Sequence, residues 1–169
     1  TLCGREYPFG PELYTCPACG EKGILDIVYD YKAVQESLNR ETLAACRDFS
    51  MWRYRALMPV ADATDVSQFL RIGWSPLYKS LRLGQELELG ALYIKDDGIN
   101  PTGSLKDRAS GVAVAKAMEL GYDTISCSST GNAASSCAGS AARMGLKAVI
   151  FVPKRAPQGK IAQLMIFGA

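Results

Sequence analysis

Residues 100–108 read NPTGSLKDR, and this stretch decides how the 169-residue chain is interpreted. Its proline and glycine favour turns, so we expect regular structure only from Ser104 onward. Ser104 and Asp107 have the spacing of a capping box, with Ser104 as the N-cap of a helix. Lys106 then falls in the first helical turn, where the macrodipole disfavours a cation. Such a position suits a nucleophilic lysine that must be neutral, although a solvated lysine offset by Asp107 is the simpler alternative.

Beyond this stretch, predicted strands and helices alternate to the end of the chain. Each predicted helix stops at a glycine, a residue that readily takes the left-handed conformation after a helix. The predicted elements are a helix from Ser104 to near Gly121, a strand Thr124–Cys127, a helix from about Asn132 to near Gly145, a strand Lys147–Val152 and a helix from about Pro157 to near Gly168. This order predicts an α/β fold with a parallel sheet and flanking helices. Because a further strand is expected after Ala169, we interpret the chain as part of a longer protein.

The first half of the chain is less regular. Apolar and polar residues alternate as in a strand at 24–31, and residues 34–49 have the periodicity of a helix. Residues 50–75 show little periodicity, and a strand is expected at 87–95 after a short extended piece. We therefore divide the chain into a zinc-ribbon-like segment at 1–30, a helical covering segment at 31–75 and an incomplete α/β domain at 76–169.

Three of the six cysteines lie close together near the N-terminus. Cys16 and Cys19 form a Cys-x-x-Cys knuckle, and Cys3 lies upstream at zinc-ribbon distance. A closed structural zinc site needs four ligands, so we expect a further cysteine just before Thr1. A redox Cys-x-x-Cys pair and a relic that no longer binds metal are the alternatives.

Three motifs in this chain resemble those of a known enzyme family. NPTGSLKDR at 100–108 resembles the cofactor-lysine motif of threonine synthases, which belong to the fold type II (tryptophan synthase β-like) pyridoxal-phosphate enzymes. SSTGN at 128–132 resembles the Ser/Thr-Gly-Asn loop of that family, and GWSPL at 73–77 is similar to its Gly-x-Thr-Pro-Leu motif. Leu105 stands where phenylalanine is usual, and Asp96-Asp97 stand where a glutamate is usual.

The resemblance implies roles for particular residues. Lys106 would hold pyridoxal phosphate as a Schiff base, and its freed amine would move protons at the substrate's α and β carbons. Asn132 would contact the ring hydroxyl of the cofactor. The residues implied in holding the substrate carboxylate are Ser128, Ser129, Thr130 and Gly131, for which simple N-capping of a helix is the alternative. The implied reaction converts O-phosphohomoserine and water to threonine and phosphate.

Two further expectations concern how this site is assembled. Ligands of open α/β sheets bind outside the carboxyl ends of the strands, so the loops of Lys106 and Asn132 are expected to converge there after successive strands. A leaving phosphate calls for cations, and the candidates are Lys154, Arg155 and Lys160, unless these form only a solvated basic turn. In the family, the loop that grips the cofactor phosphate and the partner of the pyridine nitrogen lie in sequence that follows the part matched here.

Composition narrows the function classes. Histidine is absent, which excludes Ser-His and Cys-His nucleophile systems from this chain, and the net charge of +2 does not favour nucleic acid as a partner. No apolar run reaches membrane-spanning length and no signal peptide is evident, so we predict a cytoplasmic enzyme acting on a small phosphorylated amino acid. A homodimer is left open. The alternatives are a threonine dehydratase, a cysteine or cysteate synthase, or a non-catalytic zinc-binding module.

Overall fold

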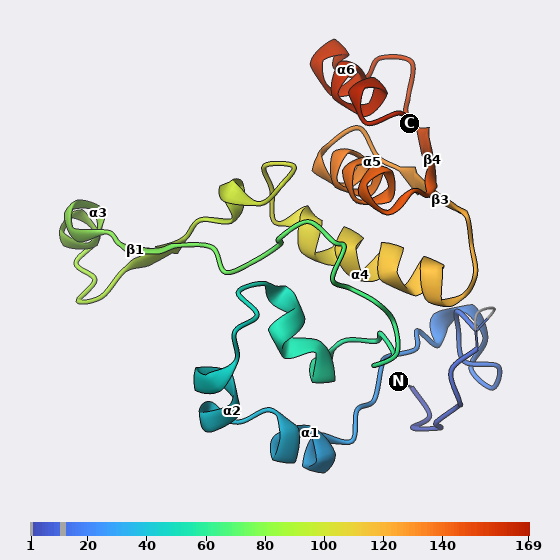
Figure 1. Ribbon diagram of the computed structural model, residues 1–169, viewed down its shortest axis with the longest axis horizontal. Coiled ribbons are helices and arrows are strands. Elements are labelled where there is room, and N and C mark those ends of the chain that lie inside the picture. The colour runs from blue at the N-terminus through green and yellow to red at the C-terminus, as the bar shows by residue number, and fades with distance from the viewer. Residues whose placement is uncertain (1, 11–12) are drawn as a thin grey trace.

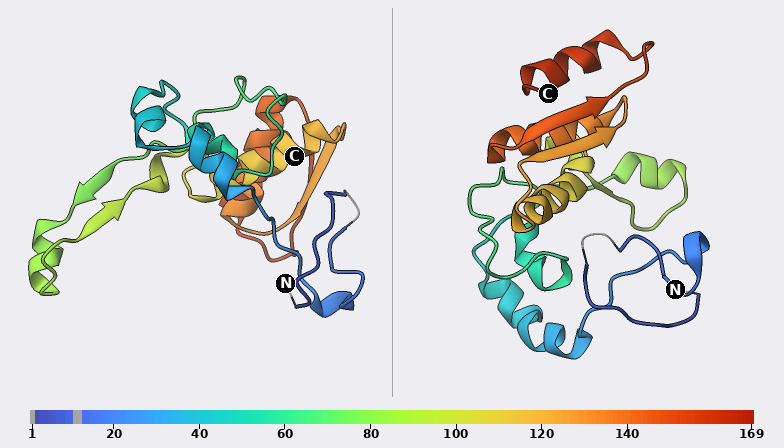
Figure 2. Two further views of the ribbon diagram at one scale, coloured as in Figure 1. Left: turned by 90° about the horizontal axis from the view of Figure 1, so that it is seen from below. Right: turned by 90° about the vertical axis from the view of Figure 1, so that its right-hand side faces the viewer.

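A computed structural model describes residues 2–10 and 13–169, in which an α/β unit carries a narrow projecting arm (Figures 1 and 2). No helix in these ranges has the length and apolar character needed to cross a membrane. The elements in chain order are the 3₁₀ helix η1 (Gly20–Lys22), α1 (Tyr31–Ser37), α2 (Arg40–Ala45), the 3₁₀ helix η2 (Met51–Leu57), β1 (Leu77–Lys79), α3 (Leu81–Glu86), β2 (Tyr93–Lys95), the 3₁₀ helix η3 (Asp97–Ile99), α4 (Lys106–Glu119), β3 (Thr124–Ser128), α5 (Asn132–Met144), β4 (Lys147–Phe151) and α6 (Gln158–Ile166).

The C-terminal half forms the predicted parallel sheet with its flanking helices. Strands β3 and β4 pair in parallel along their whole length, and α5 connects them. One face of the pair is covered, because Ala134 and Ala138 of α5 and Leu164 of α6 are buried against the partly buried Ala148 and Ile150 of β4. The alternation of inward and outward side chains along each strand produces this one-sided burial. The α/β fold class is therefore confirmed.

Helix α5 approaches its neighbours closely because its side chains are small. Residues 134–141, which contain only alanine, serine, cysteine and glycine, are all buried. At Gly139 even a methyl group would meet Cγ2 of Thr102 at 2.8 Å, a distance that real Cβ atoms do not tolerate. The loop before α4 therefore rests directly on the backbone of α5.

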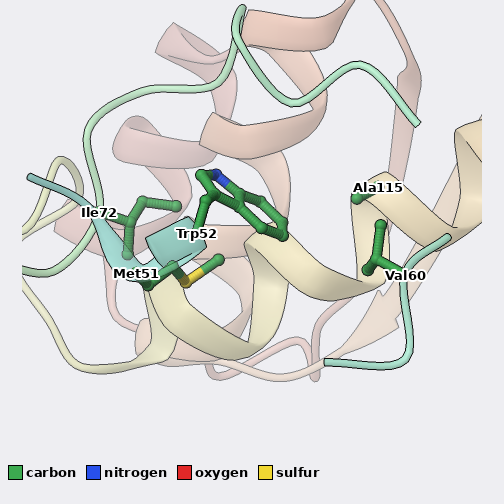
Figure 3. Packing of buried hydrophobic residues seen from close by; sticks show 5 residues of the cluster. All are labelled: Met51, Trp52, Val60, Ile72 and Ala115. Carbon is green, nitrogen blue, oxygen red and sulfur yellow. The ribbon is translucent and has the colours of Figure 1, made fainter. Parts of the chain in front are cut away.

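A second core joins the segment before β1 to helix α4. Met51, Trp52, Val60 and Ile72 are buried together with Ala115 of α4, as Figure 3 shows. Edge-to-face contact between Trp52 and a neighbouring phenylalanine ring adds to the apolar packing. The irregular segment thus lies along one side of the helix that Lys106 begins.

The projecting arm, residues 77–95, differs from the secondary structure predicted for it. The expected strand at 87–95 is reduced to β2, which pairs antiparallel with β1 in a two-stranded sheet of its own. The connection contains α3 and a turn at Glu88, whose φ of 53° is left-handed. In the described residues β2 therefore does not lie beside β3, and the expectation that the lysine loop and the 128–132 loop follow successive strands of one sheet is wrong.

Two local predictions near the N-terminus are also wrong. Residues 24–31 form no strand: Ile24 makes a single bridge with Thr15, and α1 begins at Tyr31 because the Asp30 carboxylate caps it. The expected helix at 34–49 is divided, because the side chain of Asn39 caps a second short helix, α2, in a capping box. The pattern of apolar and polar residues did not reveal where α1 and α2 begin, because a single side-chain cap, from Asp30 or Asn39, sets the start of each helix.

Candidate active site

The loop that leads into α4 is fixed by Asn100. Its side chain is buried, accepts a hydrogen bond from the Gly73 N–H at 2.9 Å and donates one to the Ser104 carbonyl at 3.1 Å. Gly103 closes the turn: its N–H bonds the Asn100 carbonyl at 2.8 Å, and its φ of 77° suits glycine. The motif at 73–77 and the stretch at 100–108 are thus held together by a buried amide.

The capping box predicted for this helix is not formed. The Ser104 hydroxyl accepts a hydrogen bond from the Lys106 N–H at 3.2 Å, but Leu105 occupies the N-cap position and makes no side-chain cap, so the prediction of Ser104 as the N-cap is wrong. Asp107, however, does not reach back to Ser104. Its buried carboxylate accepts from the N–H and the hydroxyl of Thr102 at 2.8 and 2.6 Å. Asp107 therefore holds the turn before the helix, and the capping-box prediction is corrected in this respect.

Lys106 is the first residue of α4, and its side chain is exposed. Within residues 2–10 and 13–169, no hydrogen bond or ion pair involves its Nζ. Two other lysines differ: Lys95 donates to the Ser75 carbonyl, and Lys116, near the other end of α4, pairs with Glu119. Of these three amines, only that of Lys106 is available for a ligand.

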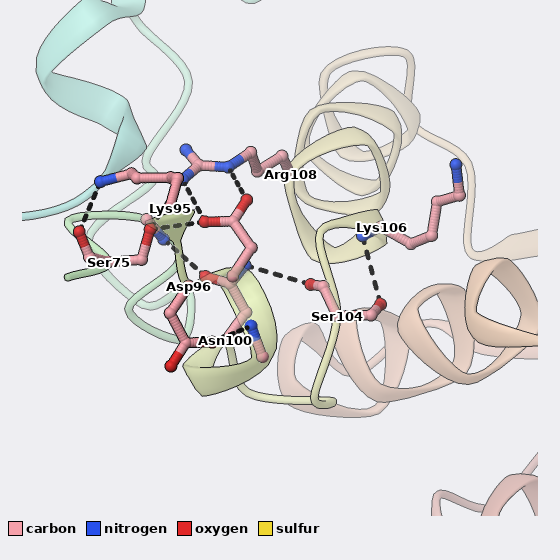
Figure 4. A network of polar contacts seen from close by, with 10 residues as sticks. Ser75, Lys95, Asp96, Asn100, Ser104, Lys106 and Arg108 are labelled. Carbon is pink, nitrogen blue, oxygen red and sulfur yellow. Dashed lines mark hydrogen bonds and ion pairs between the residues drawn. The ribbon is translucent and has the colours of Figure 1, made fainter. Parts of the chain in front are cut away.

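An ion pair on the other side of α4 connects the helix to the motif at 73–77 (Figure 4). The Arg108 guanidinium donates two hydrogen bonds to Asp97, at 2.7 and 2.8 Å, and the Ser75 hydroxyl bonds the same carboxylate at 2.5 Å. The hydrogen bonds from Arg108, followed by that from Ser75, hold the pKa of Asp97 well below its usual range. Sequence reasoning noted the acidic pair 96–97 and the arginine, but nothing in their spacing showed that they meet.

The motif at 128–132 lies where β3 ends and α5 begins. Ser128 is the last residue of the strand, and Asn132 is the first residue of the helix. The Ser129 hydroxyl accepts from the Gly131 N–H at 3.2 Å, while Gly131, at the N-cap position, makes no side-chain cap. Among the described residues, no side chain caps α5, so the N-capping alternative is not realised at the cap position.

Asn132 has a partner that the sequence did not indicate. Lys160 of α6 donates to the Asn132 Oδ1 at 2.9 Å and to the Gln163 Oε1 at 3.2 Å. The Ser135 hydroxyl bonds the same glutamine oxygen at 2.9 Å. The Lys160 amine therefore bonds a side chain at the start of α5. Lys154 and Arg155, by contrast, are exposed in the turn after β4. The described residues contain no hydrogen bond between Lys106 and the 128–132 loop; the two regions meet through Thr102 and α5.

The three N-terminal cysteines are gathered in one cluster. The sulfur atoms of Cys3, Cys16 and Cys19 all lie within 4.8 Å of one another, and those of Cys3 and Cys16 are 3.6 Å apart. A hydrogen bond between the Tyr7 hydroxyl and the Cys16 sulfur, 3.3 Å apart, is the main cause that lowers the pKa of Cys16 to about 6. Tetrahedral zinc with bonds of about 2.3 Å would set its sulfur ligands about 3.8 Å apart, so three ligand positions fit.

The fold and the lysine loop together define a class of enzyme. Residues 69–169 match the family model described as pyridoxal-phosphate-dependent enzyme, and the chain belongs to this family. Two solved structures share the fold: a pyridoxal 5'-phosphate-dependent aspartate racemase (TM-score 0.52, 28% identity, 56% of this chain and 30% of that one) and a threonine deaminase isoform from Solanum lycopersicum (TM-score 0.54, 26% identity, 63% and 29%).

Curated relatives narrow the class further. The chain is 40% identical over 168 residues to a threonine synthase of Methanocaldococcus jannaschii, a match over 99% of this chain and 40% of that protein. It is 39% identical to a threonine synthase of Methanosarcina acetivorans, with the same coverage, and 44% identical over 119 residues to one of a Bacillus species, covering 69% of this chain and 33% of that protein. The chain thus spans about two fifths of the length of the first two relatives.

Proposed function

We propose that the protein to which this chain belongs is a pyridoxal-phosphate-dependent threonine synthase, converting O-phosphohomoserine and water to threonine and phosphate. The observation that carries the proposal is the environment of the Lys106 side chain. Its amine is exposed and unpaired among the described residues, while the loop around it is held by buried polar contacts. The threonine synthase relatives support the choice of reaction.

The residues at this site suit the cofactor. Lys106 would hold its aldehyde carbon covalently, and the Asn132 amide would contact its ring hydroxyl. Because the Asn132 Oδ1 already accepts from Lys160, its Nδ2 is left to donate to an oxygen of the ring. When bound, pyridoxal phosphate supplies an electron sink for negative charge at the substrate carbons.

The start of α5 suits the substrate carboxylate. Backbone N–H groups at a helix N-terminus attract anions, and this one carries no side-chain cap. We assign the carboxylate to the residues Ser128, Ser129, Thr130 and Gly131. Of the three cations considered for the phosphate, Lys154 and Arg155 stay candidates, because Lys160 is engaged with Asn132 and Gln163.

Lys106 would then have two tasks. Released from the cofactor by the incoming amino acid, its amine would take protons from the α and β carbons of the substrate and return protons to the γ and α carbons. The phosphate leaves from the γ carbon, and water adds at the β carbon.

The test uses the full-length protein. Borohydride reduction of the protein with bound pyridoxal phosphate, followed by peptide mapping, is expected to place the adduct on Lys106, and turnover should release phosphate and threonine from O-phosphohomoserine. An adduct on Lys95 or Lys116 would refute the assignment. Release of ammonia from threonine, with no phosphate released from O-phosphohomoserine, would favour the threonine deaminase reaction, which the structural likeness keeps as the second candidate.

We further propose that the cluster of Cys3, Cys16 and Cys19 holds a structural zinc ion, with a fourth ligand from outside the described residues. The sulfur separations support this, because they are near those that tetrahedral zinc imposes on its sulfur ligands. Metal analysis of reduced full-length protein is expected to give one zinc per chain, and its absence would favour the redox or relic alternatives. The cytoplasmic location and the homodimer stay predictions.

A further inference from the structure

We propose that the ion pair between Asp97 and Arg108 is a positioning device that sets the rotation of α4 about its axis and thereby the direction of the Lys106 side chain. The inference rests on the proposed role of Lys106. Neither residue touches the cofactor or the substrate in this proposal; both act through the helix that carries the lysine.

The first part of the argument is angular. Successive residues of an α-helix are about 100° apart, so Arg108 lies about 200° around the axis from Lys106. Figure 4 shows the side chains of Arg108 and Lys106 leaving α4 on different sides, and the Arg108 guanidinium bonds Asp97. An anchor on the far side of a helix controls rotation, because any turn of the helix moves the anchored and the free side chain together.

The second part concerns how weakly the first turn is held otherwise. The first N–H groups of a helix have no partner within the helix. Leu105 at the N-cap position makes no side-chain cap. The Lys106 N–H bonds the Ser104 hydroxyl, and the N–H groups of Asp107 and Arg108 bond the carbonyls of Ser104 and Leu105 at 3.4 and 3.3 Å. These bonds lie within the turn and the loop before it, so contacts between this turn and more distant residues depend on its side chains.

Among the described residues, two side chains of this first turn act as anchors, those of Asp107 and Arg108, and that of Arg108 contacts a distant part of the chain. Asp107 bonds Thr102, five residues earlier, so this contact moves together with the loop. Arg108 bonds Asp97, which is itself bonded to Ser75, 22 residues further back. The Asp97 carboxylate thus fixes α4 relative to the motif at 73–77.

The form of the contact suits positioning better than stabilisation. The Arg108 side chain is 36% exposed and that of Asp97 18%, so the pair is screened and adds little to stability. Two parallel hydrogen bonds to one carboxylate, however, define an orientation that a single ammonium cannot reproduce. An Arg108→Lys change would keep the charge and lose this orientation.

The test compares variants of the full-length protein: Arg108→Lys, Arg108→Gln, Asp97→Asn and the Asp97→Asn/Arg108→Gln double variant. Arg82→Gln is the matched control, because Arg82 forms an ion pair with Glu86 on α3, in the projecting arm. Three quantities are measured: the rate at which added pyridoxal phosphate attaches to Lys106 in cofactor-free protein, kcat and KM separately, and the melting temperature.

We expect each single variant to slow attachment at least about tenfold and to lower kcat about 10²-fold, a typical cost of misplacing a catalytic group by about 1 Å. The double variant should be no worse than either single variant, because both remove the same contact. Melting temperatures should change by only a few degrees, and Arg82→Gln should leave all three quantities unchanged.

Two outcomes would overturn the proposal. If Arg108→Lys attaches the cofactor and turns over at the wild-type rate, the orientation of the guanidinium does not matter. If the variants lose melting temperature while the folded protein keeps its attachment rate and kcat, the pair is merely structural. An adduct on another lysine in the wild-type protein would instead refute the proposed function itself, and the inference with it.

Discussion

The cysteine cluster and the lysine loop are both short turns that present reactive groups, but they are held in opposite ways. The cluster depends on local contacts, such as the hydrogen bonds that the N–H groups of Cys19 and Gly20 make to the Cys16 carbonyl, at 3.1 and 2.9 Å. The sulfur atoms that would bind the metal are therefore also the groups that hold the cluster together. In the lysine loop the framework consists of other residues, and some of its partners, such as Gly73 and Ser75, come from another part of the chain.

This difference predicts how each region responds to damage. A turn that is held together by its metal ligands becomes disordered when one ligand is removed, because no apolar packing takes over the role of the metal. A turn built on surrounding contacts keeps its shape when the reactive group is removed, because that group contributes nothing to the framework. The four predictions below test this contrast, from the largest expected effect to the smallest.

Lys106→Ala should abolish turnover in the full-length protein and leave the fold nearly intact, because the exposed side chain has no described partner. Lys106→Arg should fail as well, since the guanidinium stays protonated and cannot attack the cofactor aldehyde. Activity assays with circular dichroism and thermal melting check both variants. A large loss of melting temperature in Lys106→Ala would show that the lysine belongs to the framework after all.

Asn132→Ala should retain the cofactor and lower the rate about 10²-fold, a typical loss when a positioned polar group is removed. The matched variant Lys160→Met removes the donor to the Asn132 Oδ1 without touching the asparagine, and we expect a smaller loss of rate. Cofactor content and kcat are the measurements. An unchanged rate in Asn132→Ala would remove this residue from the site.

Cys16→Ala should release the zinc and unfold the N-terminal segment, while borohydride trapping at Lys106 continues. The physical reason is that a closed structural site has no position for substrate. Limited proteolysis and metal analysis report on the segment, with Cys46→Ala as a control, because Cys46 lies outside the cluster. Equal loss of trapping and of metal would show that the two regions are not independent.

Gly139→Ala should lower the free energy of unfolding by about 1–3 kcal/mol, the usual cost of overpacking. The added methyl group would meet Thr102, which cannot rotate away because its hydroxyl is bonded to Asp107. Gly111→Ala is the comparison: there the closest atom is Cε of Met51, the end of a flexible side chain. Urea unfolding should show the larger loss at Gly139, and equal losses would mean that the Thr102 loop yields readily.

Sequence motifs located the lysine and the regular half of the fold because both depend on local information. The turn residues and the serine at 100–104 set the start of the helix, and glycines at 121 and 145 take the left-handed conformation at the helix ends. The parallel pair of β3 and β4 followed from the alternation of strands and helices. Near the N-terminus, the caps at Asp30 and Asn39 overruled weaker patterns.

The sequence alone thus determined that Lys106 lies in the first turn of a helix, that the C-terminal half alternates strands and helices, and that three cysteines have metal-ligand spacing. Only the tertiary structure decided that Asp107 turns back to Thr102, that Arg108 bonds Asp97, and that Lys160 bonds Asn132. The physical reason is the range of each interaction. Turns and caps depend on neighbours within a few residues, whereas the last two of these contacts join residues 11 and 28 positions apart, and a pattern in one segment carries no information about the other.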